Sequence, residues 1–208
     1  MATKKESAAK KTAEKKKAST PKKAEKPVKT AKAESVDSNV YPIGKFKMPE
    51  ELTDTVINKL IQDIRILPEH LREVKKKIKK KKQLQYTYRD GGWTIEQIIH
   101  HIADSHMNAF IRFKLTLTEN NPTVKPYDEN LWAETADVQL PVKVSVKLLK
   151  ALHTKWVALL ENMDRNDWKR TYFHPEYKRT FTLAEILPLY AWHGKHQVAQ
   201  SEVALKNN

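Results

Sequence analysis

Two segments with helical periodicity each carry a stripe of polar residues along an otherwise apolar surface. These two polar stripes constrain the fold more than any other feature of the sequence. In GGWTIEQIIHHIADSHMN, from residue 91, and in AWHGKHQVAQ, from residue 191, polar residues recur at steps of three or four. That spacing places side chains on one helix face. Two polar stripes are buried at low cost only if they meet, so both helices are predicted to face one core. The stripes comprise Gln97, His101, Asp104, Ser105 and Asn108 on one helix, and His193, His196, Gln197 and Gln200 on the other.

Four segments of helical length, with no alternation of strands and helices, predict an all-α four-helix bundle. They lie within 53–80, 94–117, 142–163 and 182–206. The first is expected to break at Pro68, because proline lacks the amide hydrogen that a helix interior needs.

The second and fourth helices have the most clearly marked starts. Thr94 is followed by Gln97, and Thr182 by Glu185, and each pair has the spacing of a capping box. Pro188 falls in the early turns of the last helix, so we expect either a kink there or a later start.

Two connections carry information of their own. Residues 120–141 contain three prolines and no clear period, and a loop of this length in a small domain usually covers or forms a site. Residues 170–182 read RTYFHPEYKRTFT and predict a short β-hairpin before the last helix, with its turn at 175–178.

Residues 1–40 differ in composition from the bundle domain predicted for 41–208. They contain 12 Lys and 5 acidic residues, a net +7 that is half of the chain's +14, and no aromatic residue. Such a segment is expected to be a disordered lysine-rich tail. Lysine clusters attract phosphate backbones without reading sequence, so the tail's expected partner is nucleic acid. The second run, Lys75–Lys82, fits a solvated helix end equally well.

Composition also excludes several classes of protein. The chain has no cysteine, which rules out disulfides, a thiol nucleophile and cysteine-ligated zinc. No window approaches the roughly 20 apolar residues of a membrane span, and the N-terminus lacks an apolar leader. We therefore expect a cytoplasmic protein with no membrane partner.

Histidines on facing helices are the device by which bundles hold metal ions. Imidazole suits zinc, nickel, copper or iron. The alternative is that these are ordinary histidines whose ring nitrogens are bonded to neighbouring groups. Spacing alone leaves both interpretations open.

Six blocks resemble the YfiT-like branch of the DinB superfamily. They are YPIGKF, GGWT, HHIADSHMNAFIRFKL, NPTVKPYDENLWAE, HPE and YAWHGKH, and they occur in order across 41–208. The resemblance implies a DinB-type bundle that holds zinc or nickel on three histidines, one from the second helix and an H-x-x-x-H pair from the last. It also implies homodimers and either hydrolase activity or S-transfer from a low-molecular-weight thiol such as bacillithiol.

Transferred to this sequence, the family's ligands fall on His101, with His100 as the alternate, and on His193 and Gln197. Position 197 is histidine in the family pattern. A glutamine oxygen is a weaker donor than imidazole, so metal affinity is expected to fall. His196 is the alternate there, but it points about 100° away on a regular helix.

Two functions follow. The first is a metal-dependent hydrolase or thiol S-transferase that acts on a small molecule, with a water or thiol activated by the ion. Asp104, Asp128 and Glu129 are its candidate general bases. The second is a bundle that lacks its metal and works as a binding protein through the basic tail. The altered residue 197 favours the second, and the retention of the other motifs favours the first.

Overall fold

The computed structural model describes residues 37–208, so the predictions made for 1–36 concern a part of the chain outside the described residues. Residues 37–40, which the sequence analysis assigns to the tail, form a turn. The backbone amide of Tyr41 donates to the Asp37 carbonyl (2.9 Å), and the Gln200 side chain donates to the Val40 carbonyl (2.9 Å). Across residues 37–208, no helix combines the length and the apolar character that a membrane span requires.

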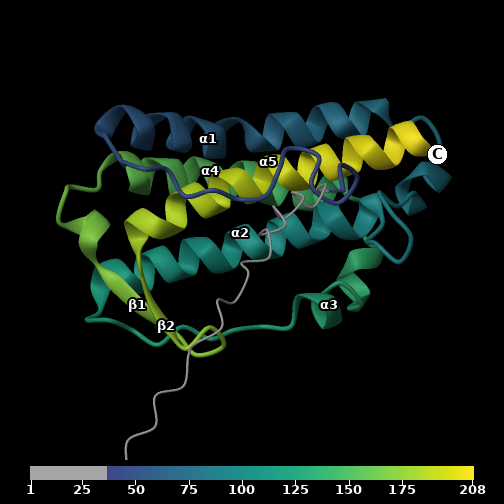
Figure 1. Cartoon of the computed structure of the whole chain (residues 1–208). Helices are drawn as coiled ribbons and strands as arrows, with labels where there is room; N and C mark the ends of the chain where they lie inside the picture. The colour runs from purple at the N-terminus through teal and green to yellow at the C-terminus, as the bar shows by residue number, and fades with distance from the viewer. Residues whose placement is uncertain (1–36) are drawn as a thin grey trace, which may run out of the picture. The chain divides into compact units, whose positions relative to one another are not determined.

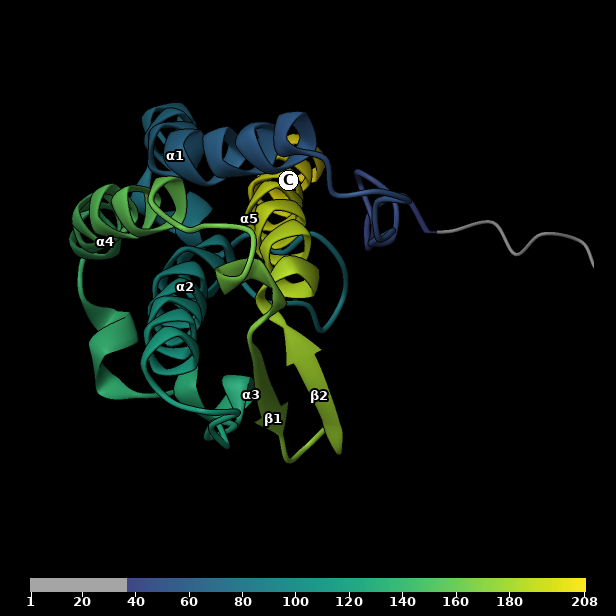
Figure 2. The same cartoon turned by 90° about the vertical axis from the view of Figure 1, so that its left-hand side faces the viewer.

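Four long helices form the predicted four-helix bundle (Figure 1). They are α1 (Asp54–Lys77), α2 (Ile95–Thr118), α4 (Lys143–Glu161) and α5 (Leu183–Asn207). Helix α1 packs on α4 and α5, and so does α2, so that α1 and α2 lie across a diagonal although they follow each other in the chain (Figure 2). All four helices therefore face one central core.

Short elements connect these helices. They are the 3-10 helices η1 (Lys81–Gln85), η2 (Ala136–Gln139) and η3 (Asp167–Lys169), and the single-turn helix α3 (Glu129–Trp132). The long connection predicted at 120–141 thus contains α3 and η2.

The predicted hairpin is present as β1 (Thr171–His174) and β2 (Arg179–Thr182), which pair in antiparallel register. Its turn closes with a hydrogen bond from the Lys178 amide to the Pro175 carbonyl (3.1 Å). The backbone of β1 also bonds to the long connection, since Val124 donates to the Phe173 carbonyl (3.0 Å). The hairpin consequently holds the start of that connection beside the bundle.

Both capping boxes form as predicted. The Thr94 hydroxyl accepts the Gln97 amide (3.2 Å), and the Gln97 side chain accepts the Thr94 amide (3.0 Å). Thr182 and Glu185 exchange the same two bonds at 3.1 and 2.8 Å. Helix α5 therefore begins at Leu183 and continues through the buried Pro188, so the later start is wrong.

The expected break at Pro68 is also wrong, because α1 runs without interruption from Asp54 to Lys77. Pro68 is buried, and its neighbours Leu67 and Leu71 are 2% and 0% exposed. A proline removes the amide that would bond to the carbonyl four residues earlier, here that of Ile64. His153 of α4 donates its Nδ1–H to that carbonyl instead (2.6 Å). Apolar burial and this replacement bond together keep the helix continuous.

The core consists of two apolar clusters. Along α1 the division falls between Ile64 and Leu67, and along α4 it falls between Leu149 and Trp156. Buried histidines of α2 and α4 lie in this interval, so a polar layer crosses the bundle between its two apolar halves. The first cluster includes Ile61, Ala109, Phe113, Leu187 and Ala191; the second includes Leu71, Ile98, Ile102, Ala103 and Val198.

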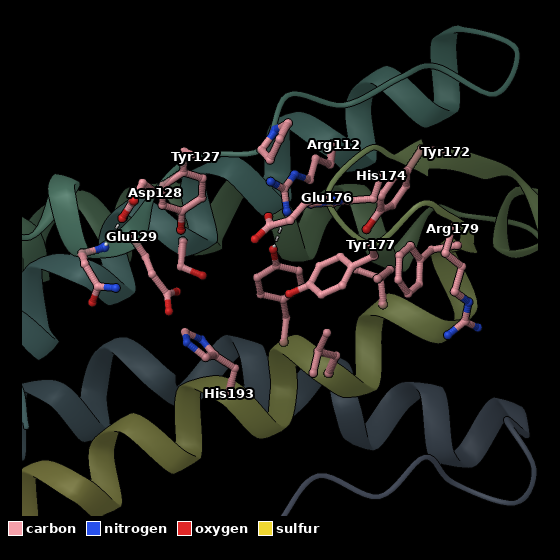
Figure 3. Close-up of a pocket in the computed structure, with 17 residues that line it drawn as sticks. Arg112, Tyr127, Asp128, Glu129, Tyr172, His174, Glu176, Tyr177, Arg179 and His193 are labelled. Carbon is pink, nitrogen blue, oxygen red and sulfur yellow. Dashed lines mark hydrogen bonds between the residues drawn. The ribbon is translucent and has the colours of Figure 1, made fainter.

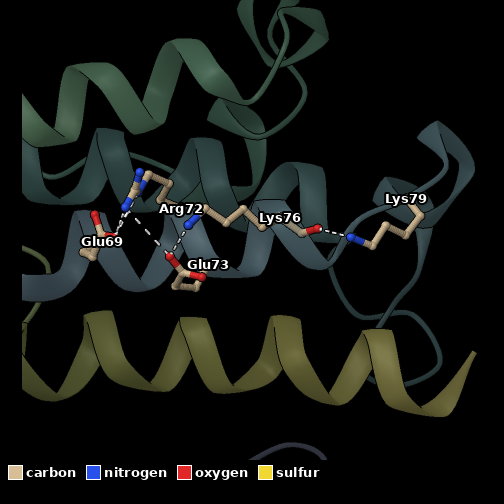
Figure 4. A network of polar contacts seen from close by, with 5 residues as sticks. All are labelled: Glu69, Arg72, Glu73, Lys76 and Lys79. Carbon is tan, nitrogen blue, oxygen red and sulfur yellow. Dashed lines mark hydrogen bonds and ion pairs between the residues drawn. The ribbon is translucent and has the colours of Figure 1, made fainter.

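The lysine run begins at the exposed end of α1 (Figure 4). Lys76 pairs with Glu73 (2.7 Å), and Lys79 donates to the Lys76 carbonyl (3.0 Å). Positive charge at a helix C-terminus is also favoured by the helix dipole. These contacts are those of a solvated helix end, and contact between the run and nucleic acid stays a prediction.

Candidate metal centre

The polar stripes of α2 and α5 meet as predicted, at His101, His193 and Gln197. The Nε2 atoms of His101 and His193 are 3.2 Å apart. The Gln197 side-chain nitrogen is 3.5 Å from His193 Nε2. Gln197 Oε1 is buried and has no hydrogen-bond partner among the described residues. His101 and Gln197 therefore both approach His193 Nε2, and Gln197 holds an unsatisfied oxygen.

The two separations measured from His193 Nε2 fit the spacing of ligands around a single small cation. Ligand atoms about 2.0–2.1 Å from a tetrahedral zinc ion lie about 3.3 Å from one another. The observed 3.2 and 3.5 Å match that separation. A half-turn of the Gln197 amide exchanges its nitrogen and oxygen, which turns the unsatisfied oxygen towards the same point. Residues 37–208 contain no group of three His, Cys, Asp or Glu side chains placed to hold a metal.

Neither alternate ligand reaches this point. His100 Nδ1 is 2.8 Å from Ser145 Oγ, and His100 Nε2 is 3.0 Å from the Leu140 carbonyl oxygen. Both ring nitrogens therefore face α4 and the loop before it. His196 stacks on Trp192, with ring centroids 4.5 Å apart. The structure thus favours His101 and His193 over the two alternates, while their role as ligands stays a prediction.

Two further histidines extend the cluster into the core. His106 Nε2 is 3.5 Å from His193 Nδ1, and His106 Nδ1 is 3.0 Å from His153 Nε2. His106 and His153 are 0% and 2% exposed. Neither is among the sequence-predicted site residues, because His106 lies five residues from His101 and so off its face, and His153 belongs to another helix. The only sequence signal was that His153 lies three residues before Trp156, on the apolar face of its helix.

These imidazoles are neutral at physiological pH. Burial lowers the pKa of His101 and of His153 to about 4. Burial also takes the pKa values of His106 and His193 well below 6.5, and neighbouring histidines add to the effect. Neutral rings each keep one bare nitrogen, which is the form that binds metal.

His193 connects this cluster to an open cavity of about 890 Å³. The cavity lies between α2, the long connection, the hairpin and α5 (Figure 3). Its wall is rich in tyrosine, and burial raises the pKa values of three of these hydroxyls, which stay protonated. The lining residues include Arg112, Tyr127, Asp128, Glu129, Tyr172, Glu176, Arg179, Tyr190 and His193.

The candidate acids separate into two groups. Glu129 lines the cavity and points its carboxylate towards the side where His193 lies (Figure 3). Burial raises its pKa, with smaller contributions from Glu176 and Asp128. Asp128 also lines the cavity, but Oδ1 caps α3 by accepting two backbone amides. Asp104 is not among the lining residues; burial, then the charge of Asp137, raises its pKa to about 6.

Two arginines line the cavity, and neither is among the residues selected from the sequence: Arg179, which pairs with Glu185, and Arg112. The Arg112 guanidinium donates to the Tyr190 hydroxyl (3.4 Å) and the Lys125 carbonyl (3.3 Å), both neutral and both at long distance. Among the ion pairs of residues 37–208, none includes Arg112. The Arg112 guanidinium therefore lies in the cavity without an ion-pair partner.

Sequence comparison places these features in a family. The profile of the DinB superfamily matches residues 61–201. A protein of Oceanobacillus iheyensis named "Putative metal-dependent hydrolase" is 46% identical over 159 residues, which are 76% of this chain and 91% of that protein. A Bacillus cereus protein of the same name is 49% identical over the same shares.

Solved structures agree with this placement. YfiT from Bacillus subtilis, described as a probable metal-dependent hydrolase with an unusual four-helix bundle topology, superimposes with a TM-score of 0.77 at 40% identity, over 82% of this chain and 98% of that one. The mycothiol-dependent maleylpyruvate isomerase shares the fold alone, with a TM-score of 0.55 at 16% identity over 68% of this chain and 59% of that one. From its profile match, its relatives and its fold, the chain belongs to the DinB superfamily.

Proposed function

We propose that this protein is a metal-dependent hydrolase whose divalent ion, zinc or nickel, is held by His101, His193 and the amide oxygen of Gln197. The observation that carries the proposal is that His101 Nε2 and the Gln197 side-chain nitrogen lie 3.2 and 3.5 Å from His193 Nε2, while the Gln197 oxygen is buried and unsatisfied. The names of the similar proteins support the reaction class.

A divalent ion at this point supplies Lewis acidity and makes a nucleophile available at neutral pH. The chain provides the rest. His193 reaches both the buried cluster and the cavity, so a substrate in the cavity meets the site from one side. Glu129, whose pKa is raised by burial, is the cavity carboxylate suited to accept a proton from the attacking group.

The cavity wall indicates the class of substrate. Arg112 offers a guanidinium without a carboxylate partner, and such a group recognises carboxylate or phosphate through paired hydrogen bonds. The Tyr127, Tyr172 and Tyr190 side chains give the wall an aromatic character. A small molecule with an anionic group and an apolar portion fits this surface.

The test is a hydrolysis assay on the full chain, stripped of metal and then supplied with zinc or nickel. Matched ester and amide substrates with and without a carboxylate separate the contribution of Arg112. We expect metal-dependent turnover that is lost in His193→Ala, and a higher KM for the anionic substrate alone in Arg112→Gln. A parallel assay supplies a low-molecular-weight thiol and an electrophile.

Glu129→Gln serves as the control for the base, since it should lower kcat without changing metal content. Turnover that is unaffected by metal removal and by His193→Ala contradicts the proposal. Metal-dependent thiol transfer without hydrolysis keeps the metal site but replaces the reaction class.

A further inference from the structure

A chain of hydrogen bonds crosses the bundle from α1 to the candidate metal centre. It runs from the Ile64 carbonyl through His153 and His106 to His193, and we call these four groups the histidine relay. Its contacts measure 2.6, 3.0 and 3.5 Å in that order. We propose that the histidine relay fixes His193 in the tautomer with its proton on Nδ1, so that Nε2 presents a bare lone pair to His101 and Gln197.

The relay begins at a carbonyl that Pro68 makes available. In a regular helix the Ile64 carbonyl accepts the amide of residue 68, but proline has no amide hydrogen. The vacant acceptor is inside the core, since Ile64 is 0% exposed, and an unpaired buried carbonyl is costly. His153 of α4 satisfies it. The buried proline thus has a structural consequence on another helix.

A carbonyl oxygen only accepts hydrogen bonds, so His153 must carry its proton on Nδ1. A neutral imidazole has one proton, and His153 Nε2 is therefore bare. His106 approaches this bare nitrogen through Nδ1, which consequently carries the proton of His106. Each assignment follows from the previous one without further choice.

The same step repeats once more towards the site. With its proton on Nδ1, His106 has a bare Nε2, and the group that faces it is His193 Nδ1. The favourable arrangement places the His193 proton on this nitrogen. His193 Nε2 is then left bare at the point where His101 Nε2 and the Gln197 amide converge.

The physical context supports a relay of neutral rings. His106 and His153 are buried, and none of the ion pairs among residues 37–208 brings a carboxylate to them. Metal-binding histidines generally donate a hydrogen bond from their second ring nitrogen to a fixed acceptor, which sets the tautomer and the ring orientation. Here two further histidines transmit that function from a backbone carbonyl. His106 and His153 are accordingly positioning residues rather than catalytic ones.

The inference rests on the proposed function for its purpose, but its test does not need a bound metal. The full chain is labelled with ¹⁵N, stripped of metal and studied by long-range ¹H–¹⁵N correlation, which separates protonated from bare ring nitrogens. Single substitutions assign the signals of the chain's 8 histidines. We expect a proton on Nδ1 of His153, His106 and His193 in the wild-type protein.

Two matched variants test whether the Ile64 carbonyl determines which ring nitrogens of the histidine relay carry the protons. His153→Phe keeps a ring of similar shape but offers His106 no acceptor. His106 should then move its proton to Nε2 and donate to His193 Nδ1, which places the His193 proton on Nε2 and lowers zinc affinity about 10–100-fold. His153→Gln keeps one acceptor and one donor, and it should preserve the wild-type His193 tautomer.

The inference is overturned if wild-type His193 carries its proton on Nε2, or if His153→Phe leaves the His193 tautomer unchanged. Should His153→Phe fail to fold, the wild-type spectrum and His153→Gln still decide. If the tautomers are as expected and the wild-type chain binds no zinc, the relay stands and the proposed function fails, so the two failures are distinguishable.

Discussion

Gly194 sets how closely α5 approaches α1 beside the candidate metal centre, and its replacement by alanine should destabilise the fold. A Cβ at this position would lie 2.4 Å from Leu67 Cδ2, and 3.2 and 3.3 Å from Cδ1 and Cγ. Leu67 is 2% exposed and has little free space into which to move. The substitution therefore forces either the Leu67 rotamer or the helix spacing to change.

Two opposing effects decide the magnitude. Alanine is favoured over glycine inside a helix by about 1 kcal/mol. Overpacking a well-filled core costs about 1–3 kcal/mol. We expect Gly194→Ala to lower the free energy of unfolding by about 0–2 kcal/mol, whereas helix propensity alone predicts that it rises by about 1 kcal/mol.

Urea denaturation of the single and double variants with Leu67→Ala measures this effect, provided that the m-values agree. With Leu67 truncated the clash is absent, so Gly194→Ala should raise the free energy of unfolding by about 1 kcal/mol in that background. Ala199→Gly, at a partly exposed position of the same helix, calibrates the propensity contribution. Equal stabilisation by Gly194→Ala in both backgrounds would refute the packing argument.

Three further outcomes follow from the structure. Because burial raises the pKa of half-buried Asp104 to about 6, its ionisation costs stability as pH rises, and Asp104→Asn should raise the free energy of unfolding at pH 7.5 by about 1 kcal/mol after allowance for solvent screening, but not at pH 3.5. Burial lowers the pKa of His153 to about 4, so the folded state is favoured above pH 6.5 and loses free energy of unfolding as the pH falls towards 4. Over that range the free energy of unfolding of metal-free His153→Gln should fall by about 3 kcal/mol less than that of the wild-type protein, as measured by denaturation at each pH. Thr182→Ala removes the cap of α5 and should cost about 1 kcal/mol, measured in the same way; no change would mean that tertiary packing alone holds the start of the helix.

Local signals in the sequence were sufficient for most of the fold. The capping boxes at Thr94 and Thr182 involve residues only three apart, so their hydrogen bonds could be predicted from spacing. The meeting of His101 and His193 could be predicted because polar stripes on two apolar helices need each other. The bundle and the hairpin followed from periodicity and turn residues.

The rest depends on contacts between helices that no local pattern encodes. Pro68 was expected to break α1, but the break is avoided by a histidine 85 positions later in the chain, on α4. His106 lies five residues after His101 and so on another face of the helix, and only the position of α4 shows that it joins His153 to His193. Arg112 gave no sequence signal, because its importance comes from its place in the cavity and from its lack of an ion pair among residues 37–208.

The most direct test of the account is a zinc titration of the full, untagged and metal-free chain by calorimetry. The wild-type protein is compared with His193→Ala, Gln197→Ala and Gln197→His. We expect one zinc ion per wild-type chain, no binding in His193→Ala, weaker binding in Gln197→Ala and tighter binding in Gln197→His. Zinc binding by Gln197→His alone would contradict it, because the glutamine would then mark a bundle that holds no metal.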